Sequence, residues 1–246
     1  MRSGIAPLVA ALALASSAPA ASPAPPLRRA TFNISAAAAV TDAAGAAVAG
    51  ELLLFAGGKG AAAESADVTA YSAGAGWTTH RGVLSGARAQ MASTALPDGS
   101  VAMFAGGEDA QKMKFGGVDV YTASTGQWSS LNLSQPRSFL AAASLVTSDA
   151  RALSVFAGGE ISEGNAGTDS GRVDIYLHGK GWIANADLLS VKRKKLAAAS
   201  AGDYVLIGGG YTSGAKGSAS RGYRDEVDLF HASDGALGSL DLMNAR

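Results

Sequence analysis

The sequence predicts an all-β fold of about four four-stranded units, and three observations lead to this prediction. First, an apolar string that ends in two glycines recurs four times, with a period of about 50 residues. Second, each string is followed by a polar loop and by another apolar string that ends in an aromatic residue. Third, the 32 glycines and the low charged fraction of 16% suit short strands joined by tight turns.

The first recurring element is an apolar strand followed by a glycine pair, at residues 53–58, 102–107, 154–159 and 205–210. Two glycines at a strand end allow positive φ angles and close approach of a neighbouring backbone, which is a structural role. The glycines concerned are Gly57, Gly58, Gly106, Gly107, Gly158, Gly159, Gly209 and Gly210. The alternative is a phosphate-binding loop. However, Ser213 stands where G-x-G-x-x-G needs its third glycine, and the pattern that follows predicts a strand rather than a helix.

The second recurring element is a strand of the pattern Val-x-apolar-aromatic, at residues 68–71, 118–121, 173–176 and 227–230. A tryptophan follows in three copies, and Leu237 takes its position in the fourth. The aromatic residues of this element are Tyr71, Tyr121, Tyr176, Trp77, Trp128 and Trp182. We expect large side chains at a fixed place in each unit to fill the space between adjacent units. A stacking platform for sugars is the functional alternative for the tryptophans.

The third recurring element is an arginine that precedes an alanine-rich strand. Arg88, Arg137 and Arg193 begin this element, and residues 140–145 form one of its strands. We expect these arginines to make structural ion pairs. In the first copy the corresponding strand is expected at residues 34–40, followed by an insertion at residues 41–50.

Four antiparallel strands form a twisted sheet that cannot bury both faces alone, and stacking such sheets around an axis gives a β-propeller. The recurring glycine pair, tyrosine and tryptophan resemble the kelch repeat. The resemblance covers residues 30–246 and implies a kelch-type β-propeller with one repeat per blade, at about 30–87, 88–136, 137–192 and 193–246. Kelch propellers usually have more than four blades. Four copies therefore predict an unusually small ring, an incomplete or open ring, or assembly between chains.

The N-terminal segment has the pattern of a secretory signal peptide. Arg2 gives a positive charge, residues 5–15 are apolar, and residues 18–20 (APA) form a small-x-small cleavage pattern. The apolar run is too short for a membrane span. The sequence thus predicts a signal peptide at 1–20, a Pro/Ala-rich linker at 21–29, and a secreted location, extracellular or in the lumen of the secretory pathway. An alanine-rich tail and a plastid transit peptide are the alternatives. Asn33 and Asn132 begin glycosylation sequons that a eukaryotic host would use.

The predicted ligand-binding residues lie on one set of loops. In a four-stranded meander, the loops after the second strands and the segments before the first strands share one face. The loops at 59–67, 108–117, 160–172 and 211–226 vary in length and carry most of the non-repeating charge. Rigid scaffolds present binding residues on such loops. The candidates are His80, Arg81, Glu108, Asp109, Glu160, Glu163, Arg172, Tyr211, Arg221 and Arg224. Polar loops that only contact solvent are the alternative.

Composition and charge limit the function. The formal net charge is zero, which argues against a nucleic-acid partner. The chain has no cysteine, which removes disulfides and thiolate metal ligands, and its three histidines lie in different repeats. We therefore expect no metal and no cofactor. The prediction is a non-catalytic interaction module that binds a protein or a glycan.

Two alternatives to that function stay open. One is a carbohydrate-active enzyme. The resemblance extends to galactose-oxidase-like propellers, whose copper chemistry uses a cysteine-linked tyrosine, so a chain without cysteine would need another mechanism such as paired carboxylates. The other is a fragment of a larger kelch adaptor or receptor, because residues 240–246 align with 131–137, just before the next first strand. Oligomerisation is expected if four blades do not close.

Overall fold

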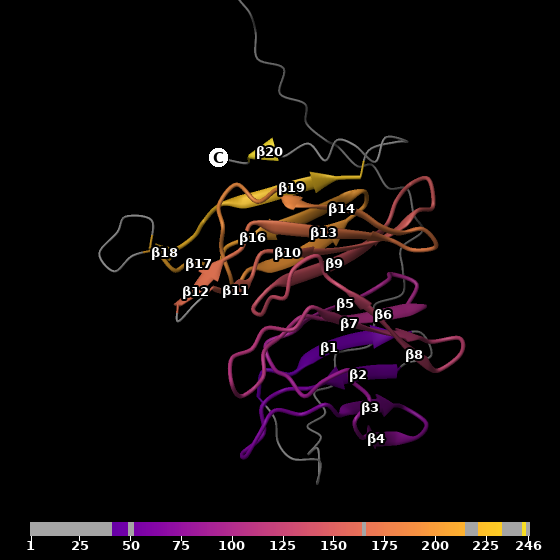
Figure 1. The fold of residues 1–246 in the computed structure, drawn as a ribbon. Helices are drawn as coiled ribbons and strands as arrows, with labels where there is room; N and C mark the ends of the chain where they lie inside the picture. The colour runs from indigo at the N-terminus through magenta and orange to yellow at the C-terminus, as the bar shows by residue number, and fades with distance from the viewer. Residues whose placement is uncertain (1–40, 49–51, 164–165, 215–220, 233–242, 245–246) are drawn as a thin grey trace, which may run out of the picture. The chain divides into compact units, whose positions relative to one another are not determined.

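The computed structural model describes residues 41–48, 52–163, 166–214, 221–232 and 243–244, all within one compact unit that spans residues 34–246. These residues form strands and no helix, and the repeats fold into four antiparallel sheets of four strands (Figure 1). The predicted all-β fold of four four-stranded units is confirmed. The predicted signal peptide, linker and strand at 34–40 lie outside the described residues, as do Asn33 and Leu237.

The four sheets follow one another along the chain, and each has its strands in sequence order. Sheet 1 consists of β1 (Ala44–Val48), β2 (Leu52–Ala56), β3 (Val68–Ser72) and β4 (Gly76–His80). Sheet 2 consists of β5 (Ala92–Ala95), β6 (Val101–Ala105), β7 (Gly117–Thr122) and β8 (Gln127–Asn132). Sheet 3 consists of β9 (Ala141–Val146), β10 (Ala152–Ala157), β13 (Arg172–Leu177) and β14 (Gly181–Asp187). Sheet 4 consists of β15 (Ala197–Ala201), β16 (Tyr204–Gly208), β19 (Val227–His231) and β20 (Met243–Asn244).

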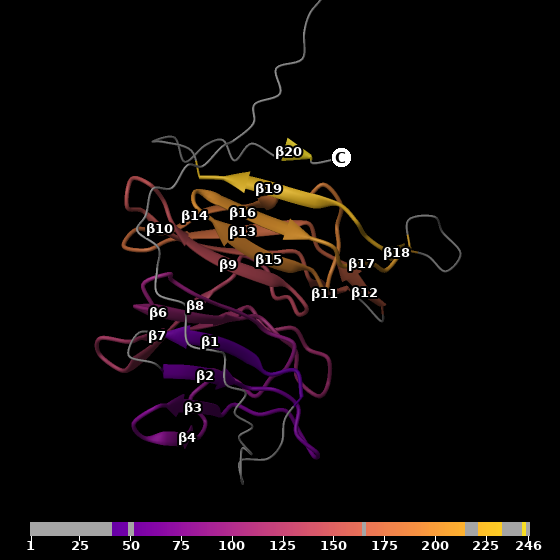
Figure 2. The same cartoon turned by 180° about the vertical axis from the view of Figure 1, so that it is seen from behind.

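Two of the loops between second and third strands carry hairpins of their own. In sheet 3 the hairpin is β11 (Glu160–Glu163) with β12 (Ala166–Asp169), and in sheet 4 it is β17 (Tyr211–Thr212) with β18 (Gly222–Tyr223). The two hairpins lie near one another in opposite views of the molecule (Figures 1 and 2). They extend the loop side of the last two sheets.

The first strand of sheet 1 differs from the sequence prediction. Residues 41–50 were expected to be an insertion, but β1 lies within them at Ala44–Val48. Ala44 pairs with Ala56 just before the glycine pair, and Ala92 with Ala105 and Ala141 with Ala157 hold the same place in sheets 2 and 3. The position of β1 is therefore set by its pairing register with the second strand, which is the same in these three sheets. Alanine content alone does not locate it.

The glycine pairs join each sheet to the segment that opens the next. Gly57 and Gly58 have φ angles of 62° and 100°. The N–H of Gly58 donates to the carbonyl oxygen of Arg88 at 2.9 Å, and a Cβ on Gly57 would lie 2.5 Å from that oxygen. The same bonds run from Gly107 to Arg137 (2.8 Å) and from Gly159 to Arg193 (2.9 Å). The predicted structural role of these glycines holds at all three junctions, because any side chain would collide with the neighbouring backbone.

The repeat arginines form buried ion pairs, as predicted. Each is fully buried and pairs with the aspartate on the third strand of the sheet that it opens; the pairs are Arg88–Asp119, Arg137–Asp174 and Arg193–Asp228. Each aspartate also accepts a hydrogen bond from a serine N–H three residues before its arginine. Sheet 1 has Thr69 at the aspartate position and Val40 at the arginine position. Each of the four repeats thus has either both members of the arginine–aspartate pair or neither of them.

Hydrophobic clusters lie between consecutive sheets. We call the face that carries Phe55, Phe104, Phe156 and Ile207 the leading face of each sheet, and the face that carries Leu54, Met103, Val155 and Leu206 the trailing face. Because neighbours along a strand point to opposite sides, these two sets lie on opposite faces. Phe104 packs in one cluster with Leu54, Phe156 with Met103, and Ile207 with Val155. The leading face of each later sheet therefore packs on the trailing face of the sheet before it.

The tyrosines and tryptophans of the repeat also lie at these junctions. Tyr121 and Trp128 of sheet 2 pack on the cluster shared with sheet 1, and Tyr176 and Trp182 of sheet 3 pack on the cluster shared with sheet 2. Gap filling was predicted for Trp77, Trp128 and Trp182; Trp128 and Trp182 lie at junctions, and the two tyrosines pack beside them. This packing leaves Trp128 and Trp182 partly buried.

Candidate functional site

The loops after the second strands and the segments before the first strands lie on one side of the sheets, as the strand alternation predicts. Isolated bridges pair Ala89 with Glu108, Ser138 with Glu160, and Lys194 with Tyr211. Each bridge joins the segment that opens a sheet to the loop that follows the second strand of that sheet. We call this side the loop face.

Four residues at equivalent repeat positions form a collar on the loop face. Asp42, Gln90, Phe139 and Lys195 each stand two positions before the start of a first strand and have φ angles of 55° to 59°. Their backbones are linked in order: Gln90 N–H donates to Asp42 O at 3.3 Å, Phe139 N–H to Gln90 O at 3.0 Å, and Lys195 N–H to Phe139 O at 2.9 Å. All four sheets thus contribute to one continuous structure.

The side chains of the collar surround a pocket. Its volume is about 440 Å³, and its lining is formed by the four collar residues and the residue that follows each of them, Ala43, Met91, Leu140 and Leu196. Asp42 and Lys195 are exposed, whereas Gln90 and Phe139 are half-buried. The pocket therefore combines a carboxylate, an amide, an aromatic ring and an ammonium group with the apolar residues that follow them in the chain.

Charge is concentrated around the ring of Phe139. The Nζ of Lys195 lies 5.0 Å from the ring centroid, and the Nζ of Lys114 lies 5.8 Å from it. Within the described part of the chain, Asp42 and Lys195 form no ion pair. A carboxylate and an ammonium group thus face the same pocket with hydrogen-bonding capacity for a ligand.

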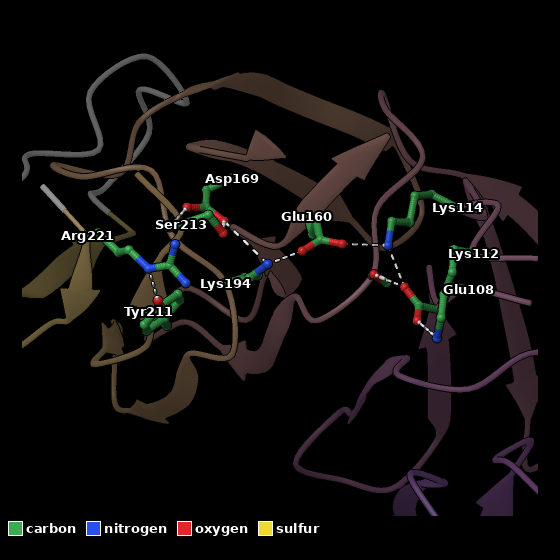
Figure 3. Close-up of polar contacts among 10 residues, drawn as sticks. Glu108, Lys112, Lys114, Glu160, Asp169, Lys194, Tyr211, Ser213 and Arg221 are labelled. Carbon is green, nitrogen blue, oxygen red and sulfur yellow. Dashed lines mark hydrogen bonds and ion pairs between the residues drawn. The ribbon is translucent and has the colours of Figure 1, made fainter. Parts of the chain in front are cut away.

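A row of alternating charges connects the loops of sheets 2 and 3 (Figure 3). Glu108 accepts hydrogen bonds from Lys112 at 2.7 Å and from Lys114, and Lys114 also donates to Glu160 at 2.8 Å. The side chains of Lys114 and Glu108 are almost fully buried. Glu108 and Glu160, both predicted to contact a ligand, accept hydrogen bonds from lysines in this row.

The row continues into the loops of sheet 4. Lys194 donates to the second carboxylate oxygen of Glu160, and its Nζ lies 3.9 Å from Asp169. Asp169 accepts hydrogen bonds from the backbone and the hydroxyl of Ser213, the latter at 3.0 Å. The same close-up shows Arg221 donating to the hydroxyl of Tyr211 at 2.9 Å (Figure 3). The row therefore fixes the loops of three sheets relative to one another.

The two glutamates of the row are held in the ionised form. Burial raises the pKa of Glu108, but hydrogen bonds from its two lysines and from Ser138 outweigh burial and bring the pKa below the ordinary 4.5. Burial likewise raises the pKa of Glu160, and the hydrogen bonds from its two lysines lower it below the ordinary value. A glycosidase needs one carboxylic acid with a raised pKa, whereas the pKa of each of these two glutamates is lowered.

The other predicted ligand-binding residues lie at several places on the loops. Asp109 accepts hydrogen bonds from N–H groups of its own loop, and Arg224 bonds Thr212 at 2.8 Å. Arg172 lines a second pocket of about 220 Å³ beside Asp169. His80 and Arg81 are exposed at the end of β4 in sheet 1. Glu163 lies on β11, and its side chain is outside the described residues.

The collar residues were not among the predicted ligand-binding residues. Gln90, Phe139 and Lys195 each stand two positions after a repeat arginine, so an alignment of the repeats places them together. Their side chains share no chemistry, and for this reason no motif marks them. Common position, rather than common residue type, was the signal available in the sequence.

The described residues contain no cluster of three histidine, aspartate or glutamate side chains that could hold a metal ion. None of the described segments forms a helix of the length and hydropathy that a membrane crossing requires.

The fold and the loop face define an all-β protein of repeated antiparallel sheets, with a pocket beside the starts of the first strands. No protein-family model and no curated protein matches the sequence. Among solved structures, the chain is similar to one described as "Structure of YjhT", with a TM-score of 0.51, 13% sequence identity and 84% of each chain covered. This likeness concerns the fold alone.

Proposed function

We propose that the chain is a kelch-type β-propeller that acts as a secreted, non-catalytic binding module, with the collar pocket as the centre of its ligand site. The ligand is a glycan or an exposed segment of a protein. The repeat motifs, the stacked sheets and the fold likeness support the propeller. The leader-like N-terminal sequence supports secretion.

The collar carries the proposal of binding. Four of the six non-glycine residues with positive φ among the described residues are Asp42, Gln90, Phe139 and Lys195. A side chain in this backbone region costs about 1–2 kcal/mol relative to glycine. Strained backbone of this kind concentrates at functional sites. The collar keeps four different side chains where glycine would be more stable, and all four line one pocket.

The pocket suits a ligand with hydroxyl groups and an apolar face. The Asp42 carboxylate and the Gln90 amide accept hydrogen bonds from hydroxyl groups, and Lys195 donates to an oxygen. The half-buried ring of Phe139 offers a flat surface for the apolar face of a sugar or for an aliphatic side chain. A preformed pocket with few polar groups is how a rigid scaffold fixes the orientation of a small ligand.

The test is a binding screen with defined probes. Saturation-transfer NMR with a panel of free oligosaccharides and of short peptides would identify a binding class. Phe139→Ala and Lys195→Ala should each weaken binding of that ligand about tenfold or more. Met113→Ala, in the exposed loop between β6 and β7, is the control and should bind normally. Unchanged affinity in both pocket variants would contradict the proposed site.

Secretion is tested separately. Expression of the full chain in a secreting host, followed by mass measurement of the exported protein, should show cleavage after Ala20. Retention of the uncleaved chain inside the cell would contradict this part of the proposal without affecting the binding site.

A further inference from the structure

Two apolar sheet faces, one at each end of the array of sheets, are open. On the leading face of sheet 1, Leu53 is 40% exposed and Phe55 is 38% exposed. Their equivalents in sheet 2, Ala102 and Phe104, are fully buried because they pack on sheet 1. The leading face of sheet 1 thus has the residues of a packed face and no sheet of the described residues against it.

The trailing face of sheet 4 is open in the same way. Leu206 is 40% exposed and Tyr204 is 42% exposed. The residues equivalent to Leu206 in sheets 1, 2 and 3 are Leu54, Met103 and Val155, and each is at most 4% exposed because the next sheet covers it. Four of the seven exposed large hydrophobic residues among those described lie on these two faces.

The open face of sheet 1 already has the geometry of a packed junction. The ring centroids of Phe55 and Trp77 are 5.8 Å apart, and those of Tyr71 and Trp77 are 5.0 Å apart. In sheet 2, the equivalent distances are 5.9 Å and 5.1 Å, and there the three aromatic rings contact sheet 1. The aromatic group of sheet 1 therefore needs no rearrangement to pack on a trailing face.

The collar has two matching ends. Three backbone hydrogen bonds link Asp42 to Gln90, Gln90 to Phe139 and Phe139 to Lys195. Among the bonds of the described residues, none joins the N–H of Asp42 to the carbonyl oxygen of Lys195. The Asp42 N–H at one end and the Lys195 carbonyl oxygen at the other are equivalent to the two groups that form a hydrogen bond at each internal junction.

We propose that the leading face of sheet 1 docks on the trailing face of sheet 4 of a second copy of this chain. Within the chain, a leading face packs on a trailing face three times. A second copy is the partner because it offers a trailing face of the same kind. Phe55 and Trp77 would pack against Leu206, and the Asp42 N–H would donate to the Lys195 carbonyl of the other copy. The contact is heterologous, so two copies or more close a ring or continue as an array.

The heterologous contact makes a specific test possible. The chain should be a dimer or larger assembly by light scattering and sedimentation at micromolar concentrations. Phe55→Glu and Leu206→Glu should each weaken self-association by about 30-fold or more, because either variant puts a charge into every contact. A mixture of the two variants should form a 1:1 heterodimer, since one intact leading face and one intact trailing face remain.

A control and two outcomes complete the experiment. The side chain of Met113 is 61% exposed and lies on neither face, so the Met113→Glu variant should assemble as the unchanged chain does. Circular dichroism should show the same β content for all variants, because the substituted side chains are already exposed. A monomer at every concentration would overturn the proposal. Homo-assembly that neither variant weakens, or variants that do not recombine when mixed, would also overturn it. The inference is independent of the ligand of the collar pocket.

Discussion

Replacing Asp174 with threonine should destabilise the protein by about 3–5 kcal/mol. Asp174 and its partner Arg137 are both fully buried. Without the carboxylate, the guanidinium keeps only its bonds to the carbonyl oxygens of Gly158 (2.9 Å) and Arg172 (2.7 Å). Burial lowers the pKa of Arg137 to about 10 although Asp174 raises it, and loss of Asp174 lowers that pKa further. Because arginine stays protonated in proteins at neutral pH, the variant retains a buried guanidinium charge without its partner. Removing one partner of a buried pair typically costs about 3–5 kcal/mol.

The assay is urea unfolding followed by circular dichroism and tryptophan fluorescence. For a domain of this size the loss corresponds to a drop in Tm of about 6–20 °C. The control is Asp187→Asn, which removes an exposed ion pair with Lys192 at 3.3 Å and should cost at most about 1 kcal/mol. Agreement between the two probes would show that the sheets unfold together.

Sheet 1 supplies a second arm of the same test. It has threonine and valine where the other sheets have aspartate and arginine. The double variant Arg137→Val with Asp174→Thr copies that combination, and it should lose less stability than the two single variants added together, with a coupling energy of about 1–3 kcal/mol. A loss of stability under about 1 kcal/mol for Asp174→Thr, or a double-variant loss equal to the sum of the two single losses, would show that Arg137 and Asp174 are not a coupled buried ion pair.

The remaining predictions concern the glycine pair, pH and the collar. Gly106→Ala should cost well over 1 kcal/mol, because the added Cβ collides with the carbonyl oxygen of Arg137. Gly126→Ala, at nearly the same φ, should cost about 1 kcal/mol, because its Cβ would meet only the Tyr121 hydroxyl oxygen at 4.0 Å; equal losses in urea unfolding would remove the close-approach argument. The pKa values of Glu108 and Glu160 are lowered on folding, so their stabilisation is present above about pH 4.5 and is lost as the pH falls through the folded values. Unfolding midpoints below pH 4.5 should therefore fall less in Glu160→Gln than in the unchanged chain, and parallel curves would contradict this. Lys195→Gly should be about 1 kcal/mol more stable than Lys195→Ala while binding ligand equally poorly, and a less stable glycine variant would argue against backbone strain at the collar.

The number and order of the sheets could be predicted from the sequence because the repeat positions carry physically distinctive residues. A glycine pair is needed where a side chain would strike the next backbone, and an arginine is needed opposite a buried aspartate. The first strand could not be placed this way. Residues 36–39 and 43–47 are both rich in alanine, which has little strand preference, and pairing with β2 decides between them.

The candidate site could be predicted only as a set of loops. Glu108 and Glu160 have no feature in the sequence that separates a ligand contact from an ion pair. Glu160 meets partners 46 and 34 residues away, and only the stacked sheets bring them together. The collar residues escaped prediction because their common property is a backbone angle.

The three arginine–aspartate pairs also bear on how the chain folds. Each pair joins residues only 31, 37 or 35 positions apart, within one sheet and the segment that opens it. Closing loops of this length costs less entropy than joining residues further apart in the chain, and contacts of lower sequence separation favour faster folding. Sheets 2, 3 and 4 can therefore each acquire their buried pair soon after their third strand is synthesised, and the next sheet then adds to a finished trailing face. Growth of this sort proceeds in one direction, from the N-terminal sheet onward, and each added sheet covers the trailing face of the sheet before it while the leading face of sheet 1 stays open.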